Sequence, residues 1–260
     1  MTDARRARAL AEIAPFVERA RAFSGWSFDD LRVMPVEPSP HADGRMTPWD
    51  YVALARERAA RSRRVVDLGT GGGEVYMRIA AGIDAEFVAS EEWHVNAPVA
   101  RDRLRPLGID VVHASSERTP WRAEAFDLIL SRHEAIEPEE IARILRPGGT
   151  FLTQQVATEQ WKELAPFFPD RTVFPDHFVE YRRGFERAGL RVTAQYHAWQ
   201  AAYATVGEIA FMLLIAPWEV PGFDPARDID RLMALEDAHG TAQGIVLTLA
   251  RYLMEAVKPA

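Results

Sequence analysis

The sequence predicts an α/β protein in which helices cover a parallel β-sheet. Short apolar and β-branched runs alternate with helix-length segments through the middle of the chain, and this rhythm is typical of parallel strands joined by helical crossovers. The first run, residues 65–74 (VVDLGTGGGE), reads as a buried strand that ends in a glycine turn and opens into a helix. Glycine is needed where a backbone takes a positive φ or approaches a ligand closely. We therefore expect the fold to be organised around this turn.

The segments before the turn differ in character. Residues 3–22 predict an amphipathic helix, because Leu10, Ile13 and Val17 share one face and the arginines lie off it. Ser24 to Pro48 is irregular, proline-rich and interspersed with aromatic residues. A loop of this length is uncommon unless it is functional or disordered, and its aromatic residues favour a lid or pocket wall. A second helix is expected from Trp49 to Ala60.

The segments after the turn continue the alternation. Pro147 and Gly148 cannot continue a helix, so the helix before them should end there and a strand should follow. On apolar patterning we expect further strands at Glu86–Ser90, Asp110–Ala114, Phe126–Ser131, Thr150–Val156, Leu190–Gln200 and Leu247–Val257. The expected helices are Glu74–Ala81, His94–Leu107, Glu139–Leu145, Asp176–Ala188, Tyr203–Ala216 and Ala226–His239.

Composition excludes several classes of protein. The chain has 260 residues, 48% of them apolar, which is ordinary for a globular protein, and a net charge of −7, which is not the basic footprint of a nucleic-acid binder. It has no cysteine, so disulfides, thiolate metal sites and cysteine nucleophiles are excluded. No apolar run approaches the roughly 20 residues needed to cross a bilayer. The arginine-rich N-terminus lacks a signal-peptide core, so we expect a cytoplasmic protein.

The glycine turn is not a dinucleotide fingerprint, because a carboxylate just before it would repel a pyrophosphate. Its D-x-G-x-G-G-G spacing from Asp67 resembles the first motif of the class I S-adenosylmethionine (SAM)-dependent methyltransferases. The spacing from Ser115 through Pro120 to Phe126-Asp127-Leu128, and the run ILRPGGTFLTQQV, resemble later motifs of that family, so that the match runs from about Arg64 to Gln155. RHEA, TQQV and APWEVPGF also resemble a bacterial subgroup whose substrates are mostly unassigned.

The resemblance implies a Rossmann-like, seven-stranded, mostly parallel sheet with helices on both faces. It implies a methyltransferase domain at residues 63–260, preceded by N-terminal helices and a substrate lid at residues 1–62. In the family the last two strands form an antiparallel hairpin. Here about 40 residues separate them, and we interpret residues 203–240 as a helical cap over the substrate side.

The implied cofactor is SAM. The residues expected to surround it are Asp67, Gly69, Thr70, Gly71, Gly73, Glu91, Glu92, Trp93, Ser115, Ser116 and Ser131. Glu91 ends the second strand, where ligands of open α/β sheets bind, and is placed to accept both ribose hydroxyls. Glu91 and Glu92 are alternatively the exposed start of the next helix. Trp93 either packs on the adenine or caps that helix. Many family members have an Asp at the position of Ser115, and that Asp contacts the amino group of the adenine. In this sequence the contact would have to come from Ser116, a backbone group or Glu117.

Methyl transfer from a sulfonium needs alignment above all, and a general base only when the nucleophile arrives protonated. His133, two residues past the fourth strand, is the candidate base, with hydrogen bonding to loop backbone as the alternative. Arg132 and Glu134 are candidates to orient a substrate, and His197 is a weaker candidate base. Of Gln154 and Gln155 only one can point into the crevice, and we favour Gln155. No metal-ligand cluster is seen.

The leading functional hypothesis is methyl transfer to a small molecule, at O, N or C of a secondary metabolite. A second is an RNA methyltransferase with the arginines of residues 5–21 and 56–64 as a phosphate track, which the acidic net charge disfavours. A third is a SAM-binding protein that acts as a sensor or catalyses another reaction, such as cyclisation of SAM. The oligomeric state, monomer or homodimer, is left open.

Overall fold

The computed structural model describes residues 3–28 and 31–260. Its described strands form one sheet in the order β1-β7-β9-β6-β5-β2-β3-β4, with β8 paired to β9. Residues 1–2 and 29–30 of the expected N-terminal and lid segments lie outside the described residues. The strands are β1 (Val33–Pro35), β2 (Arg64–Leu68), β3 (Glu86–Glu91), β4 (Asp110–His113), β5 (Phe126–Arg132), β6 (Leu145–Val156), β7 (Arg191–Tyr203), β8 (Gly240–Thr241) and β9 (Gly244–Val257).

The α/β fold and its mostly parallel sheet are confirmed. Strands β4, β3, β2, β5 and β6 are parallel neighbours, and β9 runs antiparallel between β6 and β7. The seven expected strands are all present, and the described part of the chain adds the short strands β1 and β8, which pair with β7 and β9. Strands of only two or three residues are too short to show a periodic pattern, so the sequence could not predict β1 and β8.

Helices cover both faces of the sheet. They are α1 (Asp3–Arg21), α2 (Tyr51–Ala59), α3 (Glu74–Ala80), α4 (Asn96–Leu104), α5 (Pro138–Ile144), α6 (His177–Arg187), α7 (Val206–Ile215) and α8 (Ile229–His239). One core lies between the sheet and α2, α3 and α4, and a second lies beneath α5 and α6. The parallel strands are therefore buried on both faces, as their continuous apolar sequences require.

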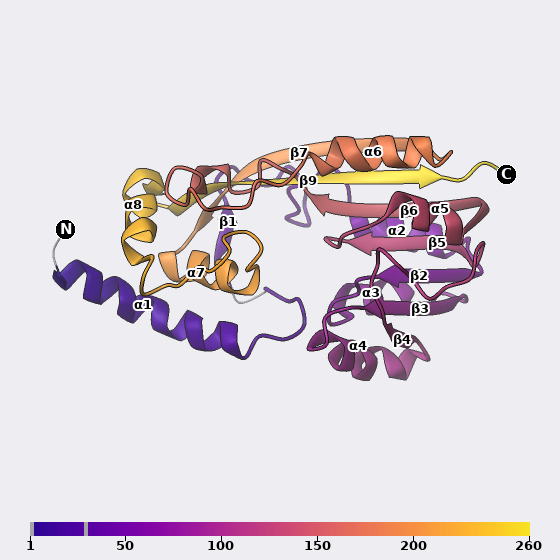
Figure 1. The fold of residues 1–260 in the computed structure, drawn as a ribbon, viewed down its shortest axis with the longest axis horizontal. Coiled ribbons are helices and arrows are strands. Elements are labelled where there is room, and N and C mark those ends of the chain that lie inside the picture. Colours follow the sequence, from indigo (N-terminus) through magenta and orange to yellow (C-terminus); the bar gives the residue numbers. More distant parts are fainter. Residues whose placement is uncertain (1–2, 29–30) are drawn as a thin grey trace.

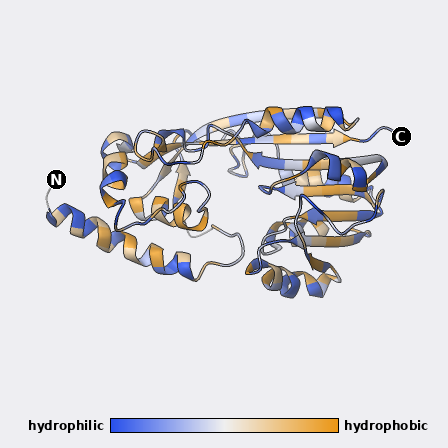
Figure 2. Ribbon diagram, in the orientation of Figure 1, coloured by the Kyte–Doolittle hydropathy of each residue, from blue (hydrophilic) through white to orange (hydrophobic). Residues whose placement is uncertain are grey.

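β7 and β9 form a long antiparallel hairpin of 13 and 14 residues. Its pairing runs from Arg191–Val257 to Tyr203–Ile245, and in Figure 1 it extends from the sheet into a second lobe that contains α1, α7 and α8. The sequence FMLLI in α7 is apolar on all sides (Figure 2), which is typical of a buried helix. A third core therefore forms where α1, α7 and α8 pack on the end of the hairpin.

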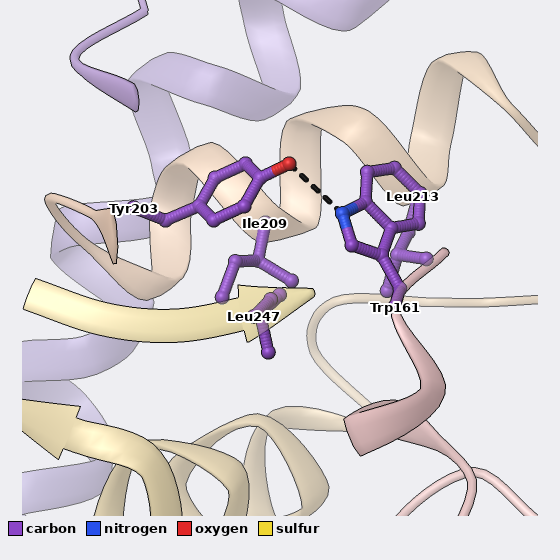
Figure 3. Close-up of a pocket in the computed structure, with 5 residues that line it drawn as sticks. All are labelled: Trp161, Tyr203, Ile209, Leu213 and Leu247. Atoms are coloured by element: carbon purple, nitrogen blue, oxygen red, sulfur yellow. Dashed lines mark hydrogen bonds between the residues drawn. The ribbon is translucent and has the colours of Figure 1, made fainter. Parts of the chain in front are cut away.

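Two buried aromatic side chains in the third core are joined by a hydrogen bond. Figure 3 shows Trp161 and Tyr203 above the aliphatic side chains of Ile209, Leu213 and Leu247. The indole Nε1 of Trp161 donates a hydrogen bond of 2.9 Å to the hydroxyl of Tyr203. Both rings are buried, and the indole N–H of Trp161 has its acceptor. No described helix is long and apolar enough to span a bilayer.

Candidate functional site

The glycine turn after β2 adopts the conformation that its sequence requires. Gly69, Gly71 and Gly73 have φ values of 67°, 61° and 80°, a region that residues with a Cβ rarely occupy. A Cβ at Gly69 would also collide with the side chain of Glu134. Thr70 lies buried within the turn, and its amide donates 3.0 Å to the carbonyl of Ser90. The turn then leads into α3, of which Gly73 is the N-cap.

Glu91, the last residue of β3, closes over this turn. Its side chain accepts hydrogen bonds from the amide of Gly71 at 2.6 Å and from the amide of Trp93 at 2.8 Å. Glu91 is buried, and burial raises the pKa of its carboxyl. A carboxylate offers about four acceptor positions, so two remain for the hydroxyls of a ligand.

Three acidic side chains converge on the glycine turn. Burial raises the pKa of Asp67 to about 7, and the charge of Glu91 contributes to this rise. Burial and the charge of Glu91 likewise raise the pKa of Glu134 to about 7. Within the described residues, none of the three forms a salt bridge. Because like charges gathered in a low-dielectric site repel one another, this turn favours a cationic ligand and disfavours a phosphate.

The other residues expected around the cofactor differ in their burial and in their hydrogen-bond partners. Ser116 is buried, and its hydroxyl has no partner among the described residues, so it is free to meet a ligand. Ser115 instead accepts a hydrogen bond from the amide of Glu117. The Ser131 hydroxyl is buried opposite Leu68, on the face away from Asp67, so only its backbone can reach the turn. Glu92 is exposed, and its carbonyl meets the ring of His113.

His133 follows β5 in a left-handed conformation, with φ of 62°, which is a strained geometry for a residue with a Cβ. Burial, and then the charges of Arg132 and Arg251, hold its pKa well below the ordinary value. Its Nε2 lies 3.3 Å from Nε2 of Gln154, while Oε1 of Gln154 accepts a 2.7 Å hydrogen bond from the indole of Trp49. The Trp49 contact fixes the Gln154 amide, so His133 is neutral, with Nε2 as the acceptor and the proton on Nδ1.

The preference for Gln155 over Gln154 was wrong. The amide of Gln155 donates to the carbonyl of Glu134 and to the hydroxyl of Thr153, on the opposite face of the strand from His133. Alternation along β6 allows only one of the two to face His133, and the contact between Gln154 and His133 shows which.

Two residues at the site are not evident from the sequence patterning. Tyr51, at the start of α2, donates a 3.3 Å hydrogen bond to the carbonyl of Ser131. Trp49, just before α2, reaches Gln154. Both lie in the expected second helix, where they resemble ordinary apolar positions. The signal that could have found them is their place at a helix N-terminus, which packs over the ends of β5 and β6.

The comparison with family models agrees with this geometry. Residues 66–153, which hold the glycine turn, Glu91 and His133, match the family described as methyltransferase domain. This segment of the chain is a methyltransferase domain.

Two curated relatives are similar to this methyltransferase domain and its flanks. One, from Mycobacterium ulcerans, is named a probable phthiotriol/phenolphthiotriol dimycocerosates methyltransferase 2 and is 27% identical over 140 residues, covering 50% of this chain and 54% of the relative. The other, from Syntrophotalea carbinolica, is named a ubiquinone/menaquinone biosynthesis C-methyltransferase and is 30% identical over 116 residues, covering 40% of this chain and 48% of the relative. The chain thus spans about half the length of these relatives.

Similarity to a solved structure extends beyond the methyltransferase domain. The crystal structure of the [4+2]-cyclase SpnF aligns with a TM-score of 0.55 and 15% identity, covering 97% of this chain and 95% of that one. At this identity the match shows a shared fold, which includes the segments on either side of the methyltransferase domain.

The lid segment approaches the methyltransferase domain at the glycine turn. The amide of Gly25 donates 2.8 Å to the side chain of Asn96, and a Cβ at Gly71 would lie 3.3 Å from the Cβ of Trp26. The ring of Trp26 meets Trp93 edge-on, with centroids 6.3 Å apart, and stacks on Trp218 at 6.5 Å. An aromatic cluster of Trp26, Trp93 and Trp218 therefore covers the turn from the lid and cap side.

The arginines considered as an RNA track are largely occupied within the protein. Arg5 and Arg6 bond to Asp237 and Asp230 of α8, and so attach α1 to the cap. Among the second group, Arg56 donates to three carbonyls around the end of α3, and Arg58 pairs with Glu255. These contacts explain the basic residues structurally. Across the described ranges, no group of three His, Asp or Glu side chains has the arrangement of a metal site.

Proposed function

We propose that the protein transfers a methyl group from SAM to a small-molecule acceptor. The observation that carries the proposal is the convergence of Asp67, Glu91 and Glu134 on the glycine turn, none of them in a salt bridge among the described residues. SAM is a fitting ligand because its sulfonium and its ammonium are both cationic, and its ribose suits the two open acceptor positions of Glu91.

Arg132 complements the acidic turn. It ends β5 on the same face as Asp67, and the charge of Asp67 raises the pKa of Arg132 against the lowering by burial. The amino-acid end of SAM is a zwitterion, so Asp67 would hold its ammonium and Arg132 its carboxylate. When bound, SAM supplies an already activated methyl group. The unpartnered hydroxyl of Ser116 is a candidate for the adenine.

His133 would act on the acceptor. As a neutral imidazole it can take a proton from a hydroxyl or amine, but its Nε2 lone pair faces the amide of Gln154. An acceptor that displaces this amide would meet a base that is already deprotonated at neutral pH. The names of both curated relatives specify small-molecule methyl acceptors, which supports this interpretation.

A second candidate function is a reaction of a bound small molecule without methyl transfer. It is favoured by the alignment with a [4+2]-cyclase over nearly the whole chain. In that case the acidic turn would still bind SAM, but the methyl group would remain on it.

Calorimetric titration with SAM and with S-adenosylhomocysteine, followed by mass analysis after incubation with SAM alone, tests both candidates. Micromolar binding of both ligands, with SAM unchanged, supports a transferase that lacks its acceptor, and a metabolite screen for methylated products then decides between the two functions. Conversion of SAM in the absence of an acceptor would refute the first candidate. Failure to bind either ligand would refute both.

A further inference from the structure

Arg251 is a second buried cation near His133, and it comes from a strand outside the matched methyltransferase segment. It lies on β9 opposite His197 of β7. Leu253, two residues along, is the register partner of Gln154, and Gln154 is the partner of Arg132. Residues paired across strands, or two apart on one strand, share a face. Arg251, Gln154 and Arg132 therefore lie on one face of the sheet.

The charge of Arg251 is not neutralised by a salt bridge in the described part of the chain. Its Nη1 donates to Oε1 of Gln160 at 2.7 Å and to the carbonyl of Ala250 at 2.8 Å, and both acceptors are neutral. Glu219 is the carboxylate whose charge raises the pKa of Arg251, but Glu219 is already paired with Arg171 at 3.1 Å. Burial lowers the pKa of Arg251 to about 10, which reflects the cost of an unmatched buried cation.

Arg251 is flanked by flat rings. Its guanidinium lies 5.9 Å from the ring centroid of Trp199, and Trp199 stacks on His197 at 5.8 Å with an interplanar angle of 21°. Both Arg251 and Trp199 are half-buried, so part of each side chain is open to a ligand. His133 is within electrostatic reach of Arg251, since the charge of Arg251 contributes to the lowered pKa of His133.

We propose that the acceptor carries a carboxylate, which binds to Arg251 beside the Trp199 ring and so presents the methylated atom to His133. The inference rests on the proposed function. A guanidinium offers donors in a fixed fork that matches a carboxylate, and two charge-assisted hydrogen bonds would compensate the buried cation. Arg132 faces Asp67 and is left to the cofactor, so the two arginines serve different ligands. His197, a candidate base in the sequence, is then part of the wall of this acceptor site.

The test uses full-length protein saturated with S-adenosylhomocysteine. Aromatic and aliphatic carboxylates, each paired with its neutral carboxamide, are screened for binding by ligand-observed NMR. We expect carboxylates to bind and their carboxamides to bind at least tenfold more weakly. Arg251→Met should abolish this preference, Arg251→Lys should restore part of it, and Arg191→Met, at an exposed position on the neighbouring strand, should leave it unchanged.

The affinity for S-adenosylhomocysteine, measured on every variant, separates the two proposals. If the wild type does not bind S-adenosylhomocysteine, the proposed function fails. If it does bind, the carboxylate inference is overturned by any of three results: no carboxylate binds, carboxamides bind equally well, or Arg251→Met retains the preference. The wild-type protein with the paired ligands tests the inference by itself, even where Arg251→Met fails to fold.

Discussion

Under the proposed function Glu91 would have two roles, because the carboxylate that holds the turn would also bind the ribose. Replacing it with alanine removes hydrogen bonds to a ribose, each worth roughly 1.5–3 kcal/mol before water compensates, and leaves the amides of Gly71 and Trp93 without their acceptor. Glu91→Ala should weaken SAM binding 10- to 100-fold in calorimetry. Glu92→Ala, at the exposed neighbour, serves as the control and should change the affinity less than about twofold. Equal affinities for wild type and Glu91→Ala would remove the ribose assignment.

The raised pKa values of Asp67 and Glu134, both about 7, predict that SAM binding releases protons. A cationic ligand binds the ionised carboxylates, so affinity should rise with pH between 5.5 and 7, by up to about tenfold per pH unit for each proton released. Calorimetry in buffers of different ionisation enthalpy measures the release directly. Glu134→Gln should remove about one proton of it. A binding enthalpy that is independent of buffer would contradict the electrostatic account of the turn.

The hydrogen-bond chain from Trp49 through Gln154 predicts the tautomer of His133. Long-range ¹H–¹⁵N NMR should show a neutral ring with the proton on Nδ1, persisting well below the ordinary pKa of histidine, because burial opposes the charged form. Gln154→Glu should raise the pKa of His133 by placing a carboxylate against Nε2. Titration of wild-type His133 near its ordinary pKa of about 6.5 would disprove this arrangement.

At the scale of elements, Glu208 connects the lid to the cap. It lies in the first turn of α7 and is buried, and its carboxylate accepts from the amide of Arg32 at 2.7 Å and from the amide of Ala204 at 2.8 Å. Glu208→Ala leaves two amides unpaired, each costing about 1–3 kcal/mol if it stays dry. We expect urea unfolding to show a loss of about 3 kcal/mol, with Glu208→Gln losing less. A loss below about 0.5 kcal/mol would mean that water replaces the carboxylate.

The elements also show what sequence patterning could and could not predict. The strands of the parallel sheet were found because their apolar runs are bounded by turn residues. β6 instead begins at Leu145, earlier than expected at Thr150, because the chain end pairs with Gly148 and Gly149 and continues the sheet through them. This contact joins residues more than a hundred positions apart, and no local pattern reports it.

Some residues of the candidate site could likewise be predicted from the sequence, and others could not. Asp67, the glycines and Glu91 are adjacent to strand ends, so their position follows from chain order and the parallel arrangement. Gln154, Trp49 and Arg251 depend on the parity of a strand, the docking of α2 and the register of the hairpin. These features depend on the tertiary structure. For that reason the sequence predicted the wrong glutamine on β6 and did not indicate Arg251.

Across the whole molecule, Trp26 joins three separate parts of the chain, because its ring contacts both Trp93 and Trp218. Since Trp26 lies against Gly71, a ligand on the turn must share this space or move the ring. We expect S-adenosylhomocysteine to change the tryptophan fluorescence of the wild type, and the change to be at least halved in Trp26→Phe. The matched control is Trp121→Phe, which alters a tryptophan packed on Phe126. Equal changes in wild type and both variants would show that Trp26 does not sense the ligand.

The long hairpin has a consequence for how such a protein can change its chemistry. The segment between β7 and β9 leaves and rejoins the sheet at Tyr203 and Ile245, which are register partners on adjacent strands. A two-residue turn could join the same two points, so this segment behaves as an exchangeable cassette. Transplanting a different cassette between these positions, together with the α1 that packs on it, would alter the lobe at the end of the hairpin and leave the glycine turn in place. Selectivity could then diversify, by recombination or in a laboratory library, without rebuilding the cofactor chemistry.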